Sequence, residues 1–265
     1  MRRAWYTRLQ IAMRSENRWR GCCGAWILLA LTACGGGAPS EPSPSPSLSS
    51  ASGDEAAAFS LAVIGSSTAA GEGASRPDHA WVAQLGQALA AATSFRVSNL
   101  AVDGYTTDDL LPGSGSEGNI DDAIDAQPDL ILIALAGSND IAAGTSSTEF
   151  LQRLSRLRDR AVAARIPAFF VSTAPKDLSD AERQRLADWA KAMGQRFAQC
   201  WVRGAAAYSP CFIDVFTALA DPELELAPKF DSGDGIHLND AGHAVVFGVA
   251  EPIVQQYVCS VTECR

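Results

Sequence analysis

A regular alternation of short apolar runs and longer helical stretches constrains this sequence more than any other feature. Residues 130–135 form one such run, which is apolar on both faces, as strands in the interior of a parallel sheet are. Other apolar runs lie at 60–65, 95–102, 168–173 and 212–215, and helical stretches lie at 81–92, 148–165, 180–199 and 241–257. The pattern predicts an α/β fold, a three-layer α/β/α sandwich with a parallel sheet of about five strands.

The charge balance argues against nucleic-acid binding. The 265 residues include 21 Lys+Arg and 30 Asp+Glu, a formal net charge of −9. Residues 1–33 hold six of the basic residues and one of the acidic ones, so the remainder carries a formal charge of −14. A region with this negative charge repels a phosphate backbone, and no later run of Lys or Arg forms a basic patch within it.

The N-terminus has the pattern of an export signal. An arginine-rich stretch precedes an apolar run at 25–31, which at seven residues is too short to cross a bilayer. The sequence Leu-Thr-Ala-Cys at 31–34 resembles the lipobox of bacterial lipoproteins, and the resemblance implies that cleavage leaves Cys34 as the lipidated first residue. A buried N-terminal helix is the alternative, but it does not explain the low-complexity stretch that follows.

The chain therefore divides into three parts. A lipoprotein signal peptide is predicted at 1–33, the lipidated cysteine with a Pro/Ser-rich linker at 34–58, and a folded domain at 59–265. The linker has almost nothing to bury, so it is expected to remain an extended tether. Translation can start at Met1 or at Met13. The expected location is the bacterial cell envelope, at the periplasmic face or the outer-membrane surface, with the membrane as a partner through the lipid anchor.

Disulfide bonds are predicted in the folded part. Three of the seven cysteines lie at or before position 34, which leaves four in the domain. An even number in an oxidising exported compartment favours disulfides over metal sites. The short separations favour Cys200 with Cys211 and Cys259 with Cys264, which is one of three possible pairings. Four free thiols are the alternative.

Small and polar residues follow the predicted strands, where ligands bind in open parallel sheets. Ser67 follows the first strand, Gly104 follows the second and Asn139 follows the third. Asp234 precedes His237 by three residues, just before the last helix. This spacing lets the carboxylate reach the imidazole N–H and fix its tautomer.

Together these segments resemble the four sequence blocks of the SGNH (GDSL-type) hydrolase superfamily, over residues 60–257. The blocks occur in the same order, and Gly-x-Asn-Asp and Asp-x-x-His are intact at 137–140 and 234–237. The first block departs from the usual Gly-Asp-Ser-Leu, because Ser66 replaces its Asp and Thr68 replaces its Leu. The resemblance implies the flavodoxin-like SGNH fold, and it leaves Ser66 as a minor alternative nucleophile.

The resemblance also implies a role for each candidate residue. Ser67 is the nucleophile, His237 accepts its proton, and Asp234 stabilises the imidazolium. The backbone N–H groups of Ser67 and Gly104 and the side-chain amide of Asn139 form the oxyanion hole. Physical chemistry agrees, because a serine hydroxyl needs a base to take its proton, and of the three histidines only His237 has a carboxylate at this offset. No metal and no cofactor are expected.

Other clusters have ordinary structural explanations. His79 lies where a helix begins and is expected to be a surface or capping residue. Asp240 and His243 lack the spacing of a metal site. Residues 113–118 match the glycine pattern of dinucleotide-binding loops, but they neither follow a predicted strand nor open a predicted helix, so a flexible loop is expected.

The sequence therefore predicts a serine esterase or acylhydrolase that cleaves carboxylic esters through an acyl-Ser67 intermediate. The expected substrates are small-molecule or polysaccharide esters, with short-chain and O-acetylated carbohydrate esters as examples. Two alternatives remain: an acyltransferase with the same triad, and a surface lipoprotein that binds ligand without turnover. The sequence does not indicate the oligomeric state.

Overall fold

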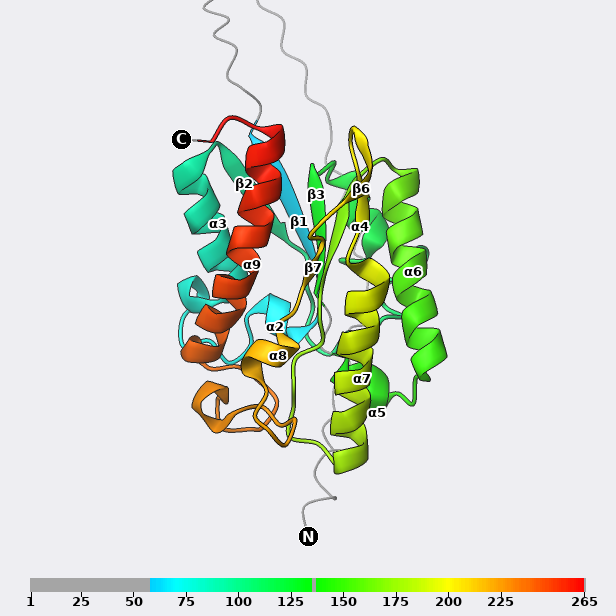
Figure 1. The fold of residues 1–265 in the computed structure, drawn as a ribbon, viewed down its shortest axis with the longest axis vertical. Coiled ribbons are helices and arrows are strands. Elements are labelled where there is room, and N and C mark those ends of the chain that lie inside the picture. The colour runs from blue at the N-terminus through cyan, green and yellow to red at the C-terminus, as the bar shows by residue number, and fades with distance from the viewer. Residues whose placement is uncertain (1–57, 135–136, 265) are drawn as a thin grey trace, which may run out of the picture. The chain divides into compact units, whose positions relative to one another are not determined.

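The computed structural model describes residues 58–134 and 137–264, so the predicted leader, Cys34 and nearly all of the linker lie outside the described residues. A five-stranded parallel sheet forms the middle layer, in the order β2-β1-β3-β4-β7 (Figure 1). Its strands are β1 (Phe59–Gly65), β2 (Phe95–Asn99), β3 (Leu130–Ala134), β4 (Ala168–Val171) and β7 (Phe212–Ile213). The predicted parallel sheet is confirmed, and its order is that of the flavodoxin-like doubly wound fold.

The central strands β1 and β3 determine where the site lies. The side chains of β3 are buried on both faces, as its apolar sequence predicts. The register pairs Gly65 with Ala134, so the two strands end level. A Cβ at Gly65 would lie 1.9 Å from the carbonyl oxygen of Ala134, so only glycine fits there. The strand order reverses between β1 and β3, and such a switch point forms the ligand crevice of open α/β sheets.

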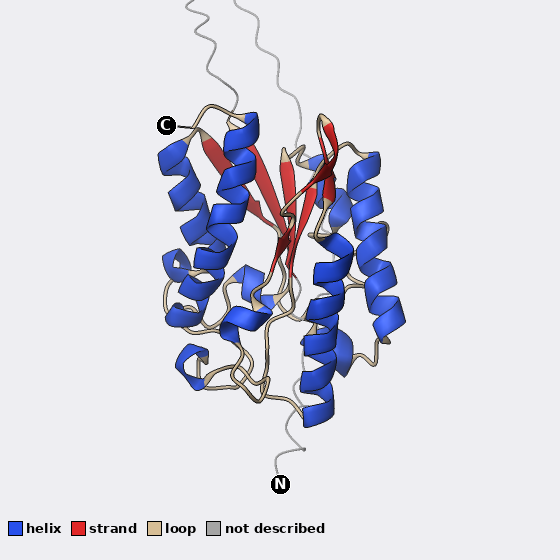
Figure 2. Cartoon of the chain, viewed as in Figure 1, coloured by secondary structure: helices blue, strands red, loops and turns tan. Residues whose placement is uncertain are grey.

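Helices cover both faces of the sheet, which confirms the predicted three layers (Figure 2). On one face lie α3 (Trp81–Ala92) and α9 (Asp240–Val261), and on the other lie α4 (Ile120–Asp125), α6 (Ser147–Ala163) and α7 (Asp180–Phe197). Each face has its own apolar core, with Trp81 and Val246 in the first and Phe150 and Trp189 in the second.

Local sequence signals explain where the long helices begin. Ser146 caps α6 by accepting the backbone N–H of Glu149, and the Glu149 carboxylate accepts the Ser146 N–H in return. Asn239 caps α9 by accepting the N–H of Gly242 at 3.0 Å. By length and composition α9 is the one described helix that could cross a membrane. One of its faces packs in the core against α3.

The sequence did not predict the short elements. They are α2 (Ser67–Ala70), α5 (Ser138–Ala142), α8 (Phe216–Leu219), the 3₁₀ turns η1 (Pro77–His79) and η2 (Pro228–Phe230), and the antiparallel hairpin of β5 (Cys200–Val202) and β6 (Ala205–Tyr208). One expectation was wrong: the segment 113–118 does lead into a helix, because Asn119 caps α4 by accepting the N–H groups of Asp121 and Asp122.

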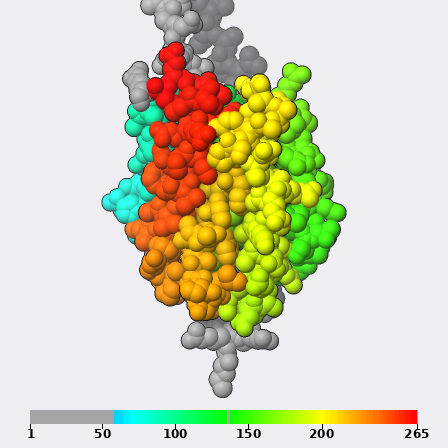
Figure 3. Space-filling model, viewed as in Figure 1, coloured from blue at the N-terminus to red at the C-terminus, as the bar shows by residue number. Residues whose placement is uncertain are grey.

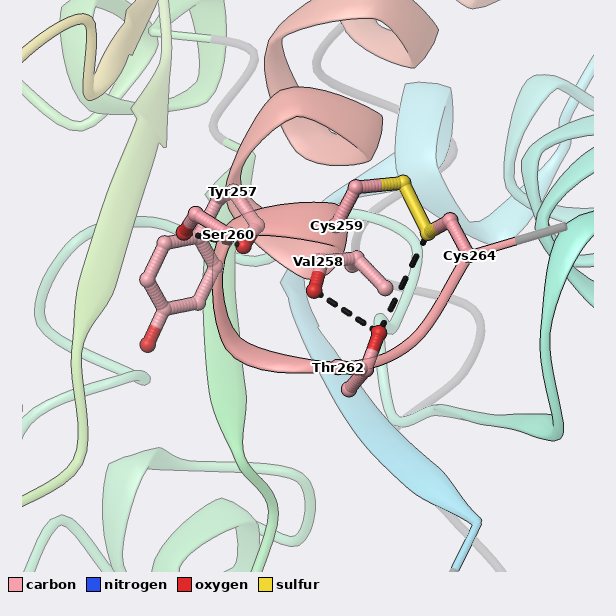
Figure 4. Close-up of a disulfide and its surroundings, with 6 residues drawn as sticks. All are labelled: Tyr257, Val258, Cys259, Ser260, Thr262 and Cys264. Carbon is pink, nitrogen blue, oxygen red and sulfur yellow. Dashed lines mark hydrogen bonds between the residues drawn. A yellow bond between two sulfur atoms is a disulfide. The ribbon is translucent and has the colours of Figure 1, made fainter.

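Two disulfides join Cys200 to Cys211 and Cys259 to Cys264, the pairings that the sequence favours. The first connects β5 to the residue that precedes β7. The second fastens the end of α9 to the C-terminal segment, beside Thr262, whose hydroxyl donates to the carbonyl of Val258 at 2.8 Å (Figure 4).

Candidate active site

The candidate site lies at the carboxyl ends of the strands, at the lower end of the molecule in Figure 1. There α2 follows β1, and α5 follows β3 after a short connection. The orange segment that precedes α9 covers the same end, where it contributes to the surface between α9 and α7 (Figure 3). Three segments that are distant in sequence therefore meet at this end.

Ser67 is the first residue of α2 and is 4% exposed. Its carbonyl accepts the N–H groups of Gly71 and Glu72 at 3.0 Å. Within the part of the chain that the structure describes, neither the N–H nor the hydroxyl of Ser67 has a hydrogen-bond partner. Both groups of Ser67 are therefore available to a ligand.

Asn139, on α5, connects the loops that follow three strands. Its Nδ2 donates to the hydroxyl of Ser66 at 2.8 Å and to the carbonyl of Tyr105 at 3.0 Å. Ser66 is fully buried and is the residue that replaces Asp in the predicted first block. Ser66 thus acts here as a neutral acceptor that helps to orient the Asn139 amide.

Asp140 supports this arrangement, although no sequence pattern indicated a separate role for it. Its buried carboxylate accepts the N–H and the hydroxyl of Thr107, and Arg153 lies 3.7 Å away. Burial raises the pKa of Asp140, while the hydrogen bonds from Thr107 and the charge of Arg153 act against this rise. The carboxylate therefore connects the Asn139 helix to the loop that follows β2.

Gly104 lies in that loop, two residues beyond Val102, which donates its N–H to the carbonyl of Gly65 at 3.2 Å. Its backbone has φ +78°, a conformation that favours glycine, and no atom lies within 4 Å of where a Cβ would be. A ligand can therefore approach the backbone of Gly104 without meeting a side chain.

Asp234 and His237 are in direct contact. Asp234 Oδ2 lies 2.6 Å from His237 Nδ1, and Oδ1 accepts the backbone N–H groups of Ile236 and His237 at 2.8 Å. Partial burial acts to raise the pKa of Asp234, but the hydrogen bonds from His237 and Ile236 outweigh it and lower the pKa to about 2. Asp234 is thus a stable carboxylate that contacts the Nδ1 side of the imidazole, opposite Nε2.

The turn that follows α2 packs against the loop that carries His237. A Cβ at Gly73 would lie 2.2 Å from the carbonyl oxygen of Leu238 and 3.1 Å from His237 Cβ, and Gly73 has φ +85°, so glycine permits this approach. Ser75 donates its N–H and its hydroxyl to Asp240, at 2.8 and 2.6 Å. These contacts hold the segment after Ser67 close to His237.

The other two histidines have structural partners. His79 Nδ1 lies 2.7 Å from Asp240, at the end of η1. His243 is fully buried, its Nε2 faces the carbonyl of Glu72 at 3.0 Å, and burial lowers its pKa. Asp240 and His243 belong to no group of three potential metal ligands among the residues that the structure describes.

A groove of about 790 Å³ lies beside the site. It runs between residues 70–77, α3 and the edge strand β2, with Gly86, Phe95 and Val97 among its lining residues. None of the candidate catalytic residues lines it.

A free serine at the switch point of a flavodoxin-like sheet, close to a loop that carries a carboxylate–imidazole pair, defines a class: a serine hydrolase on a doubly wound α/β/α sandwich. The sequence profile of the GDSL-like Lipase/Acylhydrolase family matches residues 63–245, more than half of the chain. The chain therefore belongs to this family and is a serine ester hydrolase, which confirms the predicted resemblance.

Solved structures share the fold at low sequence identity. A carbohydrate acetylesterase family member from Sinorhizobium meliloti is 18% identical with a TM-score of 0.51, over 76% of this chain and 99% of that chain. The psychrotrophic esterase EstA from Pseudoalteromonas sp. is 14% identical with a TM-score of 0.52, over 76% of this chain and 98% of that chain. TesA is 18% identical with a TM-score of 0.53, over 74% of this chain and 98% of that chain. Comparison with curated proteins gives no match.

Proposed function

We propose that the protein is an esterase that hydrolyses carboxylic esters through an acyl-Ser67 intermediate. The observation that carries this proposal is the 2.6 Å contact of Asp234 with His237 Nδ1, on a loop that packs against the turn after Ser67. The contact keeps the proton on Nδ1 and leaves Nε2 as the base, which is how a serine hydroxyl is activated.

The proposed reaction has two halves. Ser67 Oγ attacks the ester carbonyl carbon while His237 Nε2 takes the hydroxyl proton, and the imidazolium is stabilised by Asp234. The tetrahedral intermediate then collapses, the alcohol leaves with the proton from His237, and the acyl group remains on Ser67. A water molecule, activated by the same imidazole, attacks the acyl carbon, and the acid leaves as Ser67 regains its proton.

The proposed oxyanion hole consists of the N–H groups of Ser67 and Gly104 and the amide of Asn139. The N–H of Ser67 has no partner among the described residues, so it can donate without breaking a bond. Asn139 donates to Ser66 at 2.8 Å, and an oxyanion would replace this neutral acceptor with a charged one, which forms the stronger bond. The hole would therefore bind the transition state more tightly than the ester.

Ser66 is a poorer candidate for the nucleophile. It is fully buried, and its hydroxyl accepts the Asn139 amide. In this position the Ser66 hydroxyl accepts a hydrogen bond from the amide proposed to bind the oxyanion, and it does not face a substrate. We therefore assign Ser66 to the support of Asn139.

We propose short-chain or O-acetylated carbohydrate esters as the substrate class. A carbohydrate acetylesterase family member is among the proteins that share the fold, and this likeness of fold supports the proposal. A lipid anchor at Cys34 and a linker at 34–58 would place the domain at the bacterial cell envelope, where such esters occur on polysaccharides.

Hydrolysis of p-nitrophenyl acetate and butyrate by the purified protein tests the reaction. We expect turnover of these esters by the wild type and its loss in Ser67→Ala, with Ser66→Ala as the matched control that keeps turnover. No hydrolysis of any ester by the folded wild type would reject the proposal and favour a binding role. Product assays with a sugar acceptor present would reveal transfer in place of hydrolysis.

A further inference from the structure

Lys176 is a fully buried lysine in the loop that follows β4, and the proposed reaction does not use it. Its ammonium group donates to the carbonyl oxygen of Ile236, which lies between Asp234 and His237. Among residues 58–134 and 137–264, no carboxylate lies within ion-pair distance of its Nζ. Burying a lysine without an ion pair is unfavourable, so its place beneath this loop calls for an explanation.

A second contact joins the same two loops. The N–H of Asp177 donates to the carbonyl of Gly235 at 2.7 Å. Gly235 has φ +74°, and a Cβ there would lie 2.7 Å from Asp177 Cβ. The two adjacent residues Lys176 and Asp177 therefore hold the carbonyls of two adjacent residues of the Asp-x-x-His turn.

The charges around Lys176 come from three elements. Asp231 and Asp234 lie on the turn before α9, His243 lies on α9, and Asp177 is its neighbour in the loop after β4. Burial lowers the pKa of Lys176 to about 8, although the charges of Asp234 and Asp231 act to raise it. Lys176 is therefore mainly an ammonium ion at neutral pH.

We propose that Lys176 is a positioning residue for the catalytic pair: it anchors the Asp-x-x-His turn through the Ile236 carbonyl, and its buried positive charge limits how strongly Asp234 favours protonation of His237. This role rests on the proposed function. The Asp234 carboxylate stabilises the imidazolium, and the positive charge of Lys176, which acts on Asp234, weakens this stabilisation. The base then stays ready to accept the Ser67 proton over a wider range of pH.

Two substitutions separate the anchor from the charge. Lys176→Gln removes the charge and retains an N–H donor for Ile236. Lys176→Met removes both the charge and the donor while it fills similar space. Lys191→Gln is the matched control, because Lys191 is exposed on α7 and loses the same charge.

The test is an NMR titration of the His237 imidazole, which the three histidines of the chain make simple to assign through His79→Gln and His243→Gln. We expect the His237 midpoint to rise by on the order of half a pH unit in Lys176→Gln and to stay unchanged in Lys191→Gln. The acid limb of kcat/KM should move by the same amount. An unchanged or lower midpoint in folded Lys176→Gln would overturn the proposal, since a purely structural lysine gives that result.

The titration needs no turnover, so the two proposals can fail separately. An unchanged midpoint together with ester hydrolysis that depends on Ser67 rejects only the role of Lys176. A raised midpoint together with hydrolysis that survives Ser67→Ala rejects the proposed function instead. If both Lys176 variants fail to fold, the wild type provides the test: the pH at which Lys176 loses its proton is measured from its own side-chain NMR resonance, and the His237 resonances should shift at that same pH. His237 resonances that do not respond there would overturn the proposal.

Discussion

Both amide hydrogens of Asn139 are engaged in the free protein, one by Ser66 and one by the carbonyl of Tyr105. We expect Asn139→Ala to lower kcat about a hundredfold or more, since the loss of one oxyanion donor has this effect. It should also lower the free energy of unfolding by about 1–3 kcal/mol, because the buried Ser66 hydroxyl loses its partner. Steady-state kinetics and urea denaturation measure the two effects.

Ser66→Ala is the control for that experiment. It removes the same hydrogen bond but leaves the Asn139 amide, so kcat should fall much less than in Asn139→Ala. A folded Asn139→Ala protein with kcat within twofold of the wild type would exclude Asn139 from the oxyanion hole.

The contact of Asp234 with His237 predicts a single acid limb in the pH profile. Hydrogen bonds lower the pKa of Asp234 to about 2, below its ordinary value of 3.8, so this carboxylate is ionised throughout any practical assay. Because the base must be neutral to accept the Ser67 proton, kcat/KM should fall along a single limb as the pH is lowered. A profile without an acid limb would contradict the role of His237.

Unfolding does not obscure this measurement. The pKa of Asp234 is depressed in the folded state, so the stability that its ionisation contributes is present above about pH 4 and is lost only as the pH falls toward 2. A circular dichroism signal that is constant between pH 5 and 8 would show that the fall in rate reflects the chemistry.

The site residues differ in how well the sequence could predict them. Asp234 and His237 are three residues apart on one turn, so local spacing predicts their contact. The bond between Ser66 and Asn139 joins residues that are 73 apart, and only the level ends of β1 and β3 create it. Lys176 follows a proline in a loop, a context typical of exposed lysines, so no sequence signal indicates its burial.

At the scale of the elements, the pairing of β1 with β3 depends on Gly65. A Cβ there would lie 1.9 Å from a backbone oxygen of the neighbouring strand, so the strands would have to separate. We expect Gly65→Ala to lower the free energy of unfolding by about 3 kcal/mol, at the upper end of typical overpacking costs. Gly248→Ala is the control: nothing lies near its Cβ position in α9, so a gain of about 0.5–1 kcal/mol is expected. Equal stabilities of the two variants would contradict this account of the central strands.

The disulfide between Cys200 and Cys211 should stabilise the edge of the sheet where β7 pairs with β4. Removing a cross-link of this loop length costs about 3 kcal/mol in the chain-entropy view. We expect Cys200→Ala/Cys211→Ala to show this loss in urea denaturation. Cys259→Ala/Cys264→Ala should lose less, because its shorter loop lies at the C-terminal end of α9. A double variant at 200 and 211 as stable as the wild type would contradict this prediction.

The sequence predicts the strands of the sheet and the long helices, but it does not predict the short helices. Apolar runs and helical periodicity predicted all five strands of the sheet and four of the long helices, because burial imposes those patterns. The strand predicted at 95–102 is shorter in the structure and ends at Asn99. The side chain of Asn99 donates to the carbonyl of Ala69, in the helix that follows β1. Helices such as α2 and α5 are one turn long, so they carry no periodicity to detect.

At the scale of the whole molecule, the sequence predicts an acidic domain tethered to a membrane through Cys34. We expect Cys34→Ser to release a soluble protein with unchanged esterase activity, because the anchor lies outside the folded domain. Fractionation of cells that express the two forms measures this, with total activity as the control for expression. A Cys34→Ser protein that stays in the membrane fraction would refute the lipid anchor.

In the proposed reaction, Ser67 is the nucleophile that becomes acylated. The most direct test of this role is to label the wild type with a fluorophosphonate, and to locate the adduct by mass spectrometry of the peptide that contains both Ser66 and Ser67. We expect a single adduct on Ser67, retained in Ser66→Ala and absent in Ser67→Ala. An adduct on Ser66, or labelling that survives Ser67→Ala, would contradict it.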